Sequence, residues 1–270
     1  MHTIFLQGGL GNQLFMIFTV LGHAMNNNSE FYFEDCPITS GTRKKTYWDS
    51  FLKPLNKFKR HIETKKIIRE SHHHYMQIPS IPSNVTFKLY GYFQSYKYFH
   101  DYRDAIFKLI DLDRQKEQLV LKLPQRDWER VISMHFRIGD YKKFPKYHPI
   151  QPVEYYMKAL ANFEENYEWT VLYFCEEEDI EMVNGKVDRL RQLYPKMTFE
   201  RMEEKLEDWE EMLTMSLCRH HIIANSSFSY FGAYFNTRED VQVYYPSLWF
   251  GTLLKDKKTE DMFLPNWTKV

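Results

Sequence analysis

Cysteine is scarce in this sequence, and long apolar runs and a net charge are missing. The 270 residues contain 3 cysteines, at positions 36, 175 and 218. Their odd number and wide spacing exclude a disulfide framework and a structural zinc site, so we expect reduced thiols. No apolar run approaches the roughly 18–20 residues that span a bilayer.

The charge balance also removes whole classes of partner. Basic and acidic side chains number 36 each, so the bulk charge gives no reason to expect nucleic acid or a membrane as partner, and an anion site must be a local arrangement. A predicted strand begins after two residues, without the basic and apolar regions of a signal peptide. We therefore expect a soluble, cytoplasmic-type chain with no transmembrane segment.

Strand and helix patterns alternate from the start of the chain. A strand at 3–6 leads through a glycine-rich turn into a helix from Asn12 to about Met25, and a second strand follows at 31–33. Residues 37–84 are irregular and basic, and a strand at 87–90 precedes one amphipathic helix over about 97–121. This alternation predicts an α/β fold that opens with a doubly wound domain.

The first turn resembles, in part, the dinucleotide fingerprint G-x-G-x-x-G. Gly9 and Gly11 fit this pattern, but Leu14 stands where the third glycine belongs. Glu34 and Asp35 follow at the distance of a ribose-binding acid, so an NAD-type oxidoreductase is one alternative.

A second alternating set begins after a connection at 124–128. Its first strand starts near Val131, and the alternation places His135 and Arg137 on one face, opposite an apolar face. Gly139 breaks the strand, and Asp140 follows on the turn. An imidazole, a guanidinium and a carboxylate thus meet at a strand end, where open α/β sheets bind ligands. An ordinary Arg–Asp pair at a loop is the alternative.

Further helices are expected at 153–163, 187–193 and 206–218, and strands at 169–175, 197–202, 220–224 and 241–245. The strand at 220–224 runs into Asn225, Ser226, Ser227 and Phe228, at the start of an aromatic helix. Hydroxyl groups there cap the helix, or hold a phosphate with its free N–H groups. The triplet Asp111-Leu112-Asp113 matches a D-x-D metal motif but lies inside a helical pattern, which favours solvated charge.

Four stretches, in order, resemble the α1,2-fucosyltransferase family (glycosyltransferase family 11-like), which is related to α1,6- and protein O-fucosyltransferases. They are Gly8-Gly9-Leu10-Gly11-Asn12-Gln13-Leu14-Phe15, Gly91-Tyr92-Phe93-Gln94-Ser95, the H-x-R-x-G-D-Y signature at His135–Tyr141, and Asn225-Ser226-Ser227-Phe228-Ser229. The chain departs from the family in having Cys175-Glu176-Glu177 where Ser-Asp-Asp is usual, and Tyr230-Phe231-Gly232-Ala233-Tyr234 where Trp-Trp-Gly-Ala-Trp is usual.

The resemblance implies a GT-B architecture of two Rossmann-like domains facing a central cleft. The expected N-terminal domain, 1–126, takes the acceptor, and 127–248 binds GDP-L-fucose. A tail at 249–270 is expected to pack back on the first domain. The implied reaction inverts the anomeric carbon and needs no metal or other cofactor. The expected product carries fucose on O2 of a terminal galactose within an oligosaccharide or glycoconjugate.

Residue roles follow from the resemblance. Arg137 contacts the β-phosphate, and His135, Asn225, Ser226, Ser227 and Phe228 complete the GDP-fucose site. Asp208, at a helix start, is a candidate for guanine, with helix capping as its alternative. Asp140 is the first candidate for general base, with Glu154 and His148 as fallbacks. Gly11, Asn12 and Gln13 are expected on the acceptor side, where Tyr92 and Phe93 offer stacking faces to the sugar. A catalytically silent glycan-binding protein is the other alternative.

Overall fold

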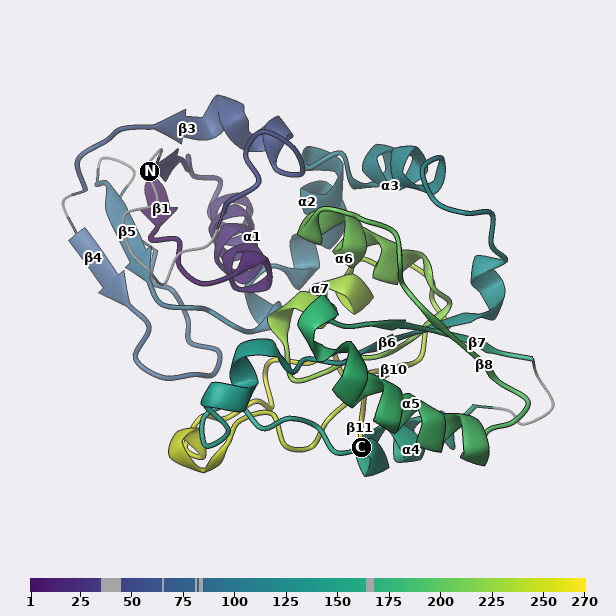
Figure 1. Ribbon diagram of the computed structural model, residues 1–270. Coiled ribbons are helices and arrows are strands. Elements are labelled where there is room, and N and C mark those ends of the chain that lie inside the picture. The colour runs from purple at the N-terminus through teal and green to yellow at the C-terminus, as the bar shows by residue number, and fades with distance from the viewer. Residues whose placement is uncertain (35–44, 65, 81, 83–84, 164–167) are drawn as a thin grey trace. The chain divides into compact units, whose positions relative to one another are not determined.

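The computed structural model describes residues 1–270 except 35–44, 65, 81, 83–84 and 164–167. The chain divides into two compact units. Unit 1 comprises Met1–Gln118 and Lys257–Leu264, and unit 2 comprises Leu119–Asp256 and Pro265–Val270 (Figure 1). The expected domains at 1–126, 127–248 and 249–270 stay a prediction, as does the GT-B arrangement.

Unit 1 is built on short parallel strands. Among its described residues, one sheet has the order β1-β5-β4, and a separate pair joins β2 to β3. All these pairings are parallel. The bounds are β1 His2–Ile4, β2 Phe33–Glu34, β3 Lys59–Arg60, β4 Lys66–Arg69 and β5 Phe87–Tyr90. Strands β3 and β4 lie in the segment expected to be irregular, so that expectation was wrong there.

The described helices of unit 1 are α1 Leu10–Asn26, α2 Arg103–Leu109 and α3 Leu112–Val120, the last two residues of which belong to unit 2. Helix α1 is buried along most of its length, which its run of apolar residues explains. The expectation of a single helix over 97–121 is wrong. Short 3₁₀ turns precede α2, and Asp111, with a φ of 57°, separates α2 from α3. A non-glycine residue in this left-handed region ends a helix.

Unit 2 holds a larger parallel sheet. Its described residues form six strands in the order β11-β10-β9-β6-β7-β8, with every neighbouring pair parallel. The bounds are β6 Val131–His135, β7 Thr170–Phe174, β8 Thr198–Arg201, β9 His220–Ile222, β10 Val243–Tyr245 and β11 Thr268–Lys269. The chain builds outward from β6 through β7 to β8 and then returns to the other side of β6. The strand order therefore reverses between β6 and β9, the place where such sheets bind ligands.

Helices cover both faces of this sheet. They are α4 Val153–Leu160, α5 Ile180–Leu193, α6 Asp208–Leu217 and α7 Ser227–Tyr234. One core combines apolar residues of α4 and α5 with Ile132, Met134, Phe136 and Ile138, which confirms the apolar face expected for the first strand. Val131, Leu172 and Phe174 point the other way, toward Met215 of α6. The α/β class is confirmed, although α5 begins at Ile180 and not at the expected Val187.

Candidate active site

Three neighbouring strands of unit 2 deliver polar residues to one edge of the sheet. Arg137 follows the end of β6, Glu176 follows the end of β7, and Ser226 follows the end of β9. Because β6 lies between β7 and β9 and all three strands are parallel, their carboxyl ends meet. The reversal of strand order thus places a cation between an acidic turn and a helix N-terminus.

Arg137 is held by two carboxylates. Its guanidinium donates to Glu176 and to Asp140, and it lies 5.0 Å from the centre of the Tyr141 ring. The Arg137 side chain is 23% exposed, so it stays accessible to a ligand while its stem is packed. The expected Arg137–Asp140 neighbourhood is therefore present, whereas Glu176 was not among the predicted site residues.

Asp179 stabilises the turn that carries Asp140. Gly139 N–H donates to the Asp179 carboxylate at 2.6 Å, and Lys142 Nζ lies 2.6 Å from the other oxygen. Gly139 has a φ of +28°, and a Cβ there would lie 2.8 Å from each Glu176 carboxylate oxygen. The positive φ therefore favours glycine where the strand ends, and any larger residue there would also have to push the Glu176 carboxylate aside.

His135 faces the helix on the other side. Its ring centre lies 5.8 Å from that of Phe228, in the first turn of α7. Burial, and then the charge of Arg137, lower the pKa of His135 to about 3, so the imidazole is neutral at pH 7. Its Nδ1 is buried without a hydrogen-bond partner in the described part of the chain.

Ser226 is the N-cap of α7. Its Oγ accepts a hydrogen bond from Phe228 N–H at 3.2 Å, as the capping alternative predicts. Ser226 is buried, and Ser227 and Phe228 are half-buried. The first turn of α7 therefore offers N–H groups next to His135, and phosphate binding by Ser226 and Ser227 stays a prediction.

Asn225 forms hydrogen bonds to three other segments of unit 2. Its side-chain amide donates to Pro149 O at 2.9 Å and to Trp249 O at 3.1 Å, while its backbone carbonyl accepts from Tyr141 Oη at 2.9 Å. Asn225 thus joins the loop after β6 to the loop after β10. It supports the site, and direct contact of Asn225 with a donor stays a prediction.

Helix α6 contributes two carboxylates on one face, Asp208 and Glu211. Glu207 is the N-cap and forms a capping box with Glu210, so the capping alternative for Asp208 is wrong. Asp208 is exposed. Burial raises the pKa of Glu211 to about 7, with smaller contributions from Asp208 and Glu176. Sequence analysis missed Glu211, whose helical spacing from Asp208 was the available signal.

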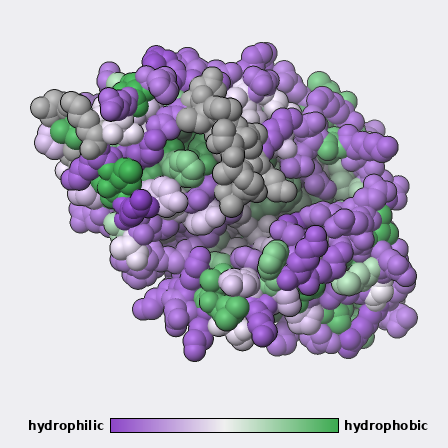
Figure 2. Space-filling model, turned by 60° about the vertical axis from the view of Figure 1, so that its left-hand side comes forward, coloured by the Kyte–Doolittle hydropathy of each residue, from purple (hydrophilic) through white to green (hydrophobic). Residues whose placement is uncertain are grey.

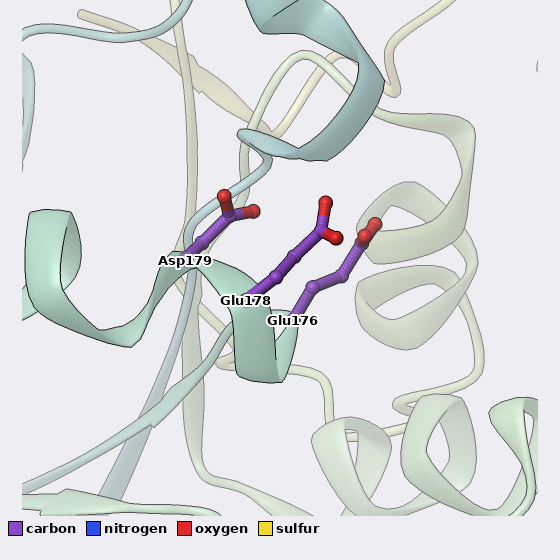
Figure 3. Close-up of side chains that lie close together, drawn as sticks. All are labelled: Glu176, Glu178 and Asp179. Carbon is purple, nitrogen blue, oxygen red and sulfur yellow. The ribbon is translucent and has the colours of Figure 1, made fainter.

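Figure 3 shows three carboxylates of the acidic turn, Glu176, Glu178 and Asp179, pointing the same way. Their ligand atoms lie within 4.8 Å of one another, which is a spacing that a divalent cation accepts. However, Glu176 is paired with Arg137 and Asp179 with Lys142, so two of the three carboxylates already have an internal cation as partner. The expected independence from metal stays a prediction.

The fallback base candidates have other partners. Glu154 forms an ion pair with Arg189 at 2.9 Å. His148 stacks on Tyr141, with ring centres 4.8 Å apart. Through Tyr141 it lies beside the Arg137 turn, so of the two only His148 is tied to the strand-end group.

In unit 1, the glycine-rich turn is tightly packed. Gln13 is fully buried, and its amide donates to Gly8 O at 2.9 Å and accepts from Thr46. Gly11 is also buried, whereas Asn12 is half-buried and accepts from Gln94 Nε2 at 2.7 Å. Of the three predicted acceptor-side residues, Asn12 alone reaches the surface, and the acceptor role stays a prediction.

Three other expectations concern unit 1. Phe93 is fully buried, so it has no free face for a sugar, while Tyr92 is half-buried. Glu34, named in the nicotinamide alternative, lies 2.5 Å from Lys88 Nζ, and Asp35 and Cys36 lie outside the described residues. Asp111 of the D-x-D triplet pairs with Arg114 at 3.7 Å.

No helix in the described part of the chain has the length and apolar character needed to cross a membrane.

The chain is 26% identical to the O-antigen biosynthesis glycosyltransferase WbnK of Escherichia coli, over 96% of this chain and 98% of that protein. It is 22% identical to an alpha-1,2-colitosyltransferase of E. coli, over 91% of each chain. A glycosyl transferase family 9 structure from Veillonella parvula DSM 2008 aligns with a TM-score of 0.48 and 11% identity, over 100% of this chain and 86% of that one.

A family model decides the assignment. The model of glycosyl transferase family 11 matches residues 1–270, which is a finding against the nicotinamide alternative. The predicted fucosyltransferase-like character is confirmed at the level of the family. The chain belongs to glycosyltransferase family 11.

Proposed function

We propose that this glycosyltransferase moves L-fucose from GDP-β-L-fucose to O2 of a terminal galactose, with inversion at the anomeric carbon and without a metal. The observation that carries the proposal is the position of Arg137 between the ends of β7 and β9. It has a helix N-terminus on one side and carboxylates on the other. A nucleotide diphosphate needs such a combination of cation and N–H donors.

Arg137 is the group that stabilises the departing GDP. As the bond from the anomeric carbon to the β-phosphate oxygen breaks, negative charge grows on that oxygen, and a guanidinium fork can bind two phosphate oxygens at once. In the structure this fork donates to Asp140 and Glu176. Donor binding therefore exchanges at least one carboxylate for phosphate, which frees that carboxylate for other work.

We assign the freed carboxylate of Asp140 as general base. The galactose hydroxyl oxygen attacks the anomeric carbon, its proton passes to Asp140, and GDP leaves with the electron pair of the broken bond. Asp140 is well exposed, with a side-chain accessibility of 61%, so it can reach an acceptor. Asp140→Asn should lower kcat without weakening GDP binding, because it also removes a carboxylate that competes with phosphate for Arg137. A loss of GDP affinity equal to the loss of kcat would contradict the assignment.

The guanine base needs an acceptor for its N1–H and N2–H groups. A carboxylate sheltered from water performs this task best, because its hydrogen bonds do not compete with solvent. Glu211 is the more sheltered of the two α6 carboxylates, and Asp208 is the predicted one. The affinities for GDP and for ADP, measured in Glu211→Gln and in Asp208→Asn, decide between the two residues. The variant that lacks the guanine-binding carboxylate should lose its preference for GDP over ADP.

The decisive experiment is release of GDP from GDP-fucose in the presence of EDTA, with a panel of terminal-galactose acceptors and Arg137→Ala as control. We expect release that depends on the acceptor and is lost in the variant. Release that appears only after a divalent ion is added would make the acidic turn of Figure 3 a metal site. Binding of GDP without transfer to any acceptor would favour the silent glycan-binding alternative.

Colitose, which lacks the 3-hydroxyl of fucose, is a second candidate for the transferred sugar. It is favoured by the similarity to an alpha-1,2-colitosyltransferase. GDP-fucose and GDP-colitose, compared by kcat/KM with the same acceptor, separate the two. A site that hydrogen-bonds the 3-hydroxyl should prefer fucose strongly, because otherwise a polar group in the site loses its partner.

A further inference from the structure

Two loops of unit 2 that follow strands of its sheet are joined by backbone hydrogen bonds. The first, 144–147, follows the turn that carries Asp140, and the second, 248–255, follows β10. Gly251 N–H donates to Tyr147 O at 2.8 Å, and Leu253 N–H donates to Lys146 O at 2.9 Å. A Cβ at Gly251 would collide with the Lys146 carbonyl, so glycine allows the two loops to meet.

The joined loops expose large apolar side chains. Phe144 is 54% exposed, Tyr147 43%, Leu248 56% and Leu253 57%. Phe144 and Tyr147 contact each other edge to face, with ring centres 6.4 Å apart. Such side chains are usually scattered singly over a soluble protein, and Figure 2 shows a face on which apolar areas lie among mostly hydrophilic residues. Phe144, Tyr147 and Leu253 therefore lie on two loops that are bonded to each other, and Leu248 begins the second of these loops.

Basic side chains lie on the same loops or directly before the first of them. Lys143, Lys146 and Lys255 are exposed, and within the described part of the chain no ion pair engages them. Lys142 is not part of this set, because it pairs with Asp179. Asp256 is the acidic residue that follows Lys255, so the local balance is positive although the whole chain has a net charge of zero.

We propose that this surface, made of Phe144, Tyr147, Leu248 and Leu253 with Lys143, Lys146 and Lys255, docks the enzyme on an anionic lipid bilayer. Aromatic rings and leucines enter the interface between headgroups and acyl chains, while lysines bind anionic headgroups. An acidic protein partner would match the lysines but would leave the four apolar side chains without a counterpart. The first loop begins next to Asp140, so a docked enzyme would hold its strand-end site near the lipid surface and suit an acceptor carried on a lipid.

The test is flotation of the whole chain with vesicles, without any sugar substrate, so its outcome is independent of the proposed transfer reaction. Vesicles of phosphatidylcholine alone are compared with equal mixtures of phosphatidylcholine and phosphatidylglycerol, at low and at high salt. We expect binding to the anionic vesicles that weakens with salt. The pair Lys143→Glu and Lys146→Glu should weaken it by about tenfold or more, and the pair Phe144→Ser and Leu253→Ser by a similar factor.

The matched control is Leu193→Ser with Lys196→Glu, because these residues are also exposed on unit 2 and lie outside the joined loops. It should bind like the unchanged chain, and thermal unfolding of all variants confirms that they are folded. Transfer to a soluble acceptor should be the same in the loop variants and the unchanged chain. Failure to bind anionic vesicles, equal binding to both kinds of vesicle, or equal loss in the control would overturn the proposal.

Discussion

Arg137 and Glu176 follow the ends of two adjacent parallel strands and form an ion pair across the edge of the sheet. Glu176 therefore competes with a diphosphate for the same guanidinium. Removing its charge should make GDP bind more tightly, because the ligand no longer displaces a carboxylate and meets less negative charge. We expect Glu176→Gln to lower the Kd for GDP by about three- to tenfold, measured by calorimetry at low salt.

The control for this prediction is Glu178→Gln. Glu178 belongs to the same acidic turn, and its carboxylate lies beside that of Glu176 (Figure 3). It makes the same change in net charge without releasing Arg137. Equal tightening in both variants would mean that overall charge, and not competition for the guanidinium, controls GDP affinity.

Arg137→Lys tests the guanidinium fork. Lysine keeps the positive charge but has no planar pair of donors for two phosphate oxygens. We expect kcat to fall by about 10²–10³, the range seen when a transition-state donor is removed, with a much smaller change in GDP affinity. Arg189→Lys, at an exposed ion pair with Glu154, should retain nearly full activity. Retention of full turnover in Arg137→Lys would refute the assigned role.

The sequence predicted most elements of unit 2 well, because strongly alternating and short apolar strand segments dominate there. The apolar face of β6 and the capped helix after Ser226 both follow from local pattern alone. Unit 1 was harder. Strand β4 has the exposed pattern of an edge strand, and it forms only by pairing with β5. The break at Asp111 is a single left-handed residue inside an otherwise helical sequence.

The candidate site also contains residues that a local motif predicts and residues that only the fold brings in. His135, Arg137 and Asp140 are adjacent in sequence, so one motif was enough to bring them together. Glu176 comes beside them because β7 is the neighbour of β6, and Glu211 lies near enough to Glu176 for their charges to interact. No local sequence pattern contains this information. The Asn225 amide donates to Pro149 O, and the Gln13 side chain accepts from Thr46. These partners are distant in sequence, so no local pattern predicts them. The expected substrate contacts of Asn225 and Gln13 stay a prediction.

The raised pKa of Glu211 predicts how the stability of the chain depends on pH. Its pKa is raised to about 7 in the folded chain by burial, then by Asp208 and Glu176, against a usual value near 4.5. The folded chain therefore holds a proton that the unfolded chain releases between about pH 4.5 and 7, so this group lowers stability as the pH rises through that window. Glu211→Gln should stabilise the chain by about 1–2 kcal/mol at pH 8 and have no effect at pH 4. Urea unfolding at both pH values checks this, and an equal effect at both would contradict it.

Glu70 fixes the loop that follows β5. Its carboxylate accepts from Tyr92 N–H at 2.8 Å and from Phe93 N–H at 3.0 Å, and Phe93 has a φ of 50°. A left-handed phenylalanine is costly unless its surroundings impose it. The buried Phe93 ring and the two hydrogen bonds to Glu70 do so, and the next residue, Gln94, donates to Asn12.

Glu70→Gln should therefore lower the free energy of unfolding by about 2 kcal/mol at pH 7. The amide has one acceptor oxygen for two N–H groups, and its own NH₂ faces a backbone donor. Glu63→Gln, an exposed residue on the approach to β4, is the matched control and should change the free energy of unfolding by less than about 0.5 kcal/mol. If both variants unfold at the same urea concentration as the unchanged chain, packing of the Phe93 ring alone holds the loop, and the carboxylate is dispensable.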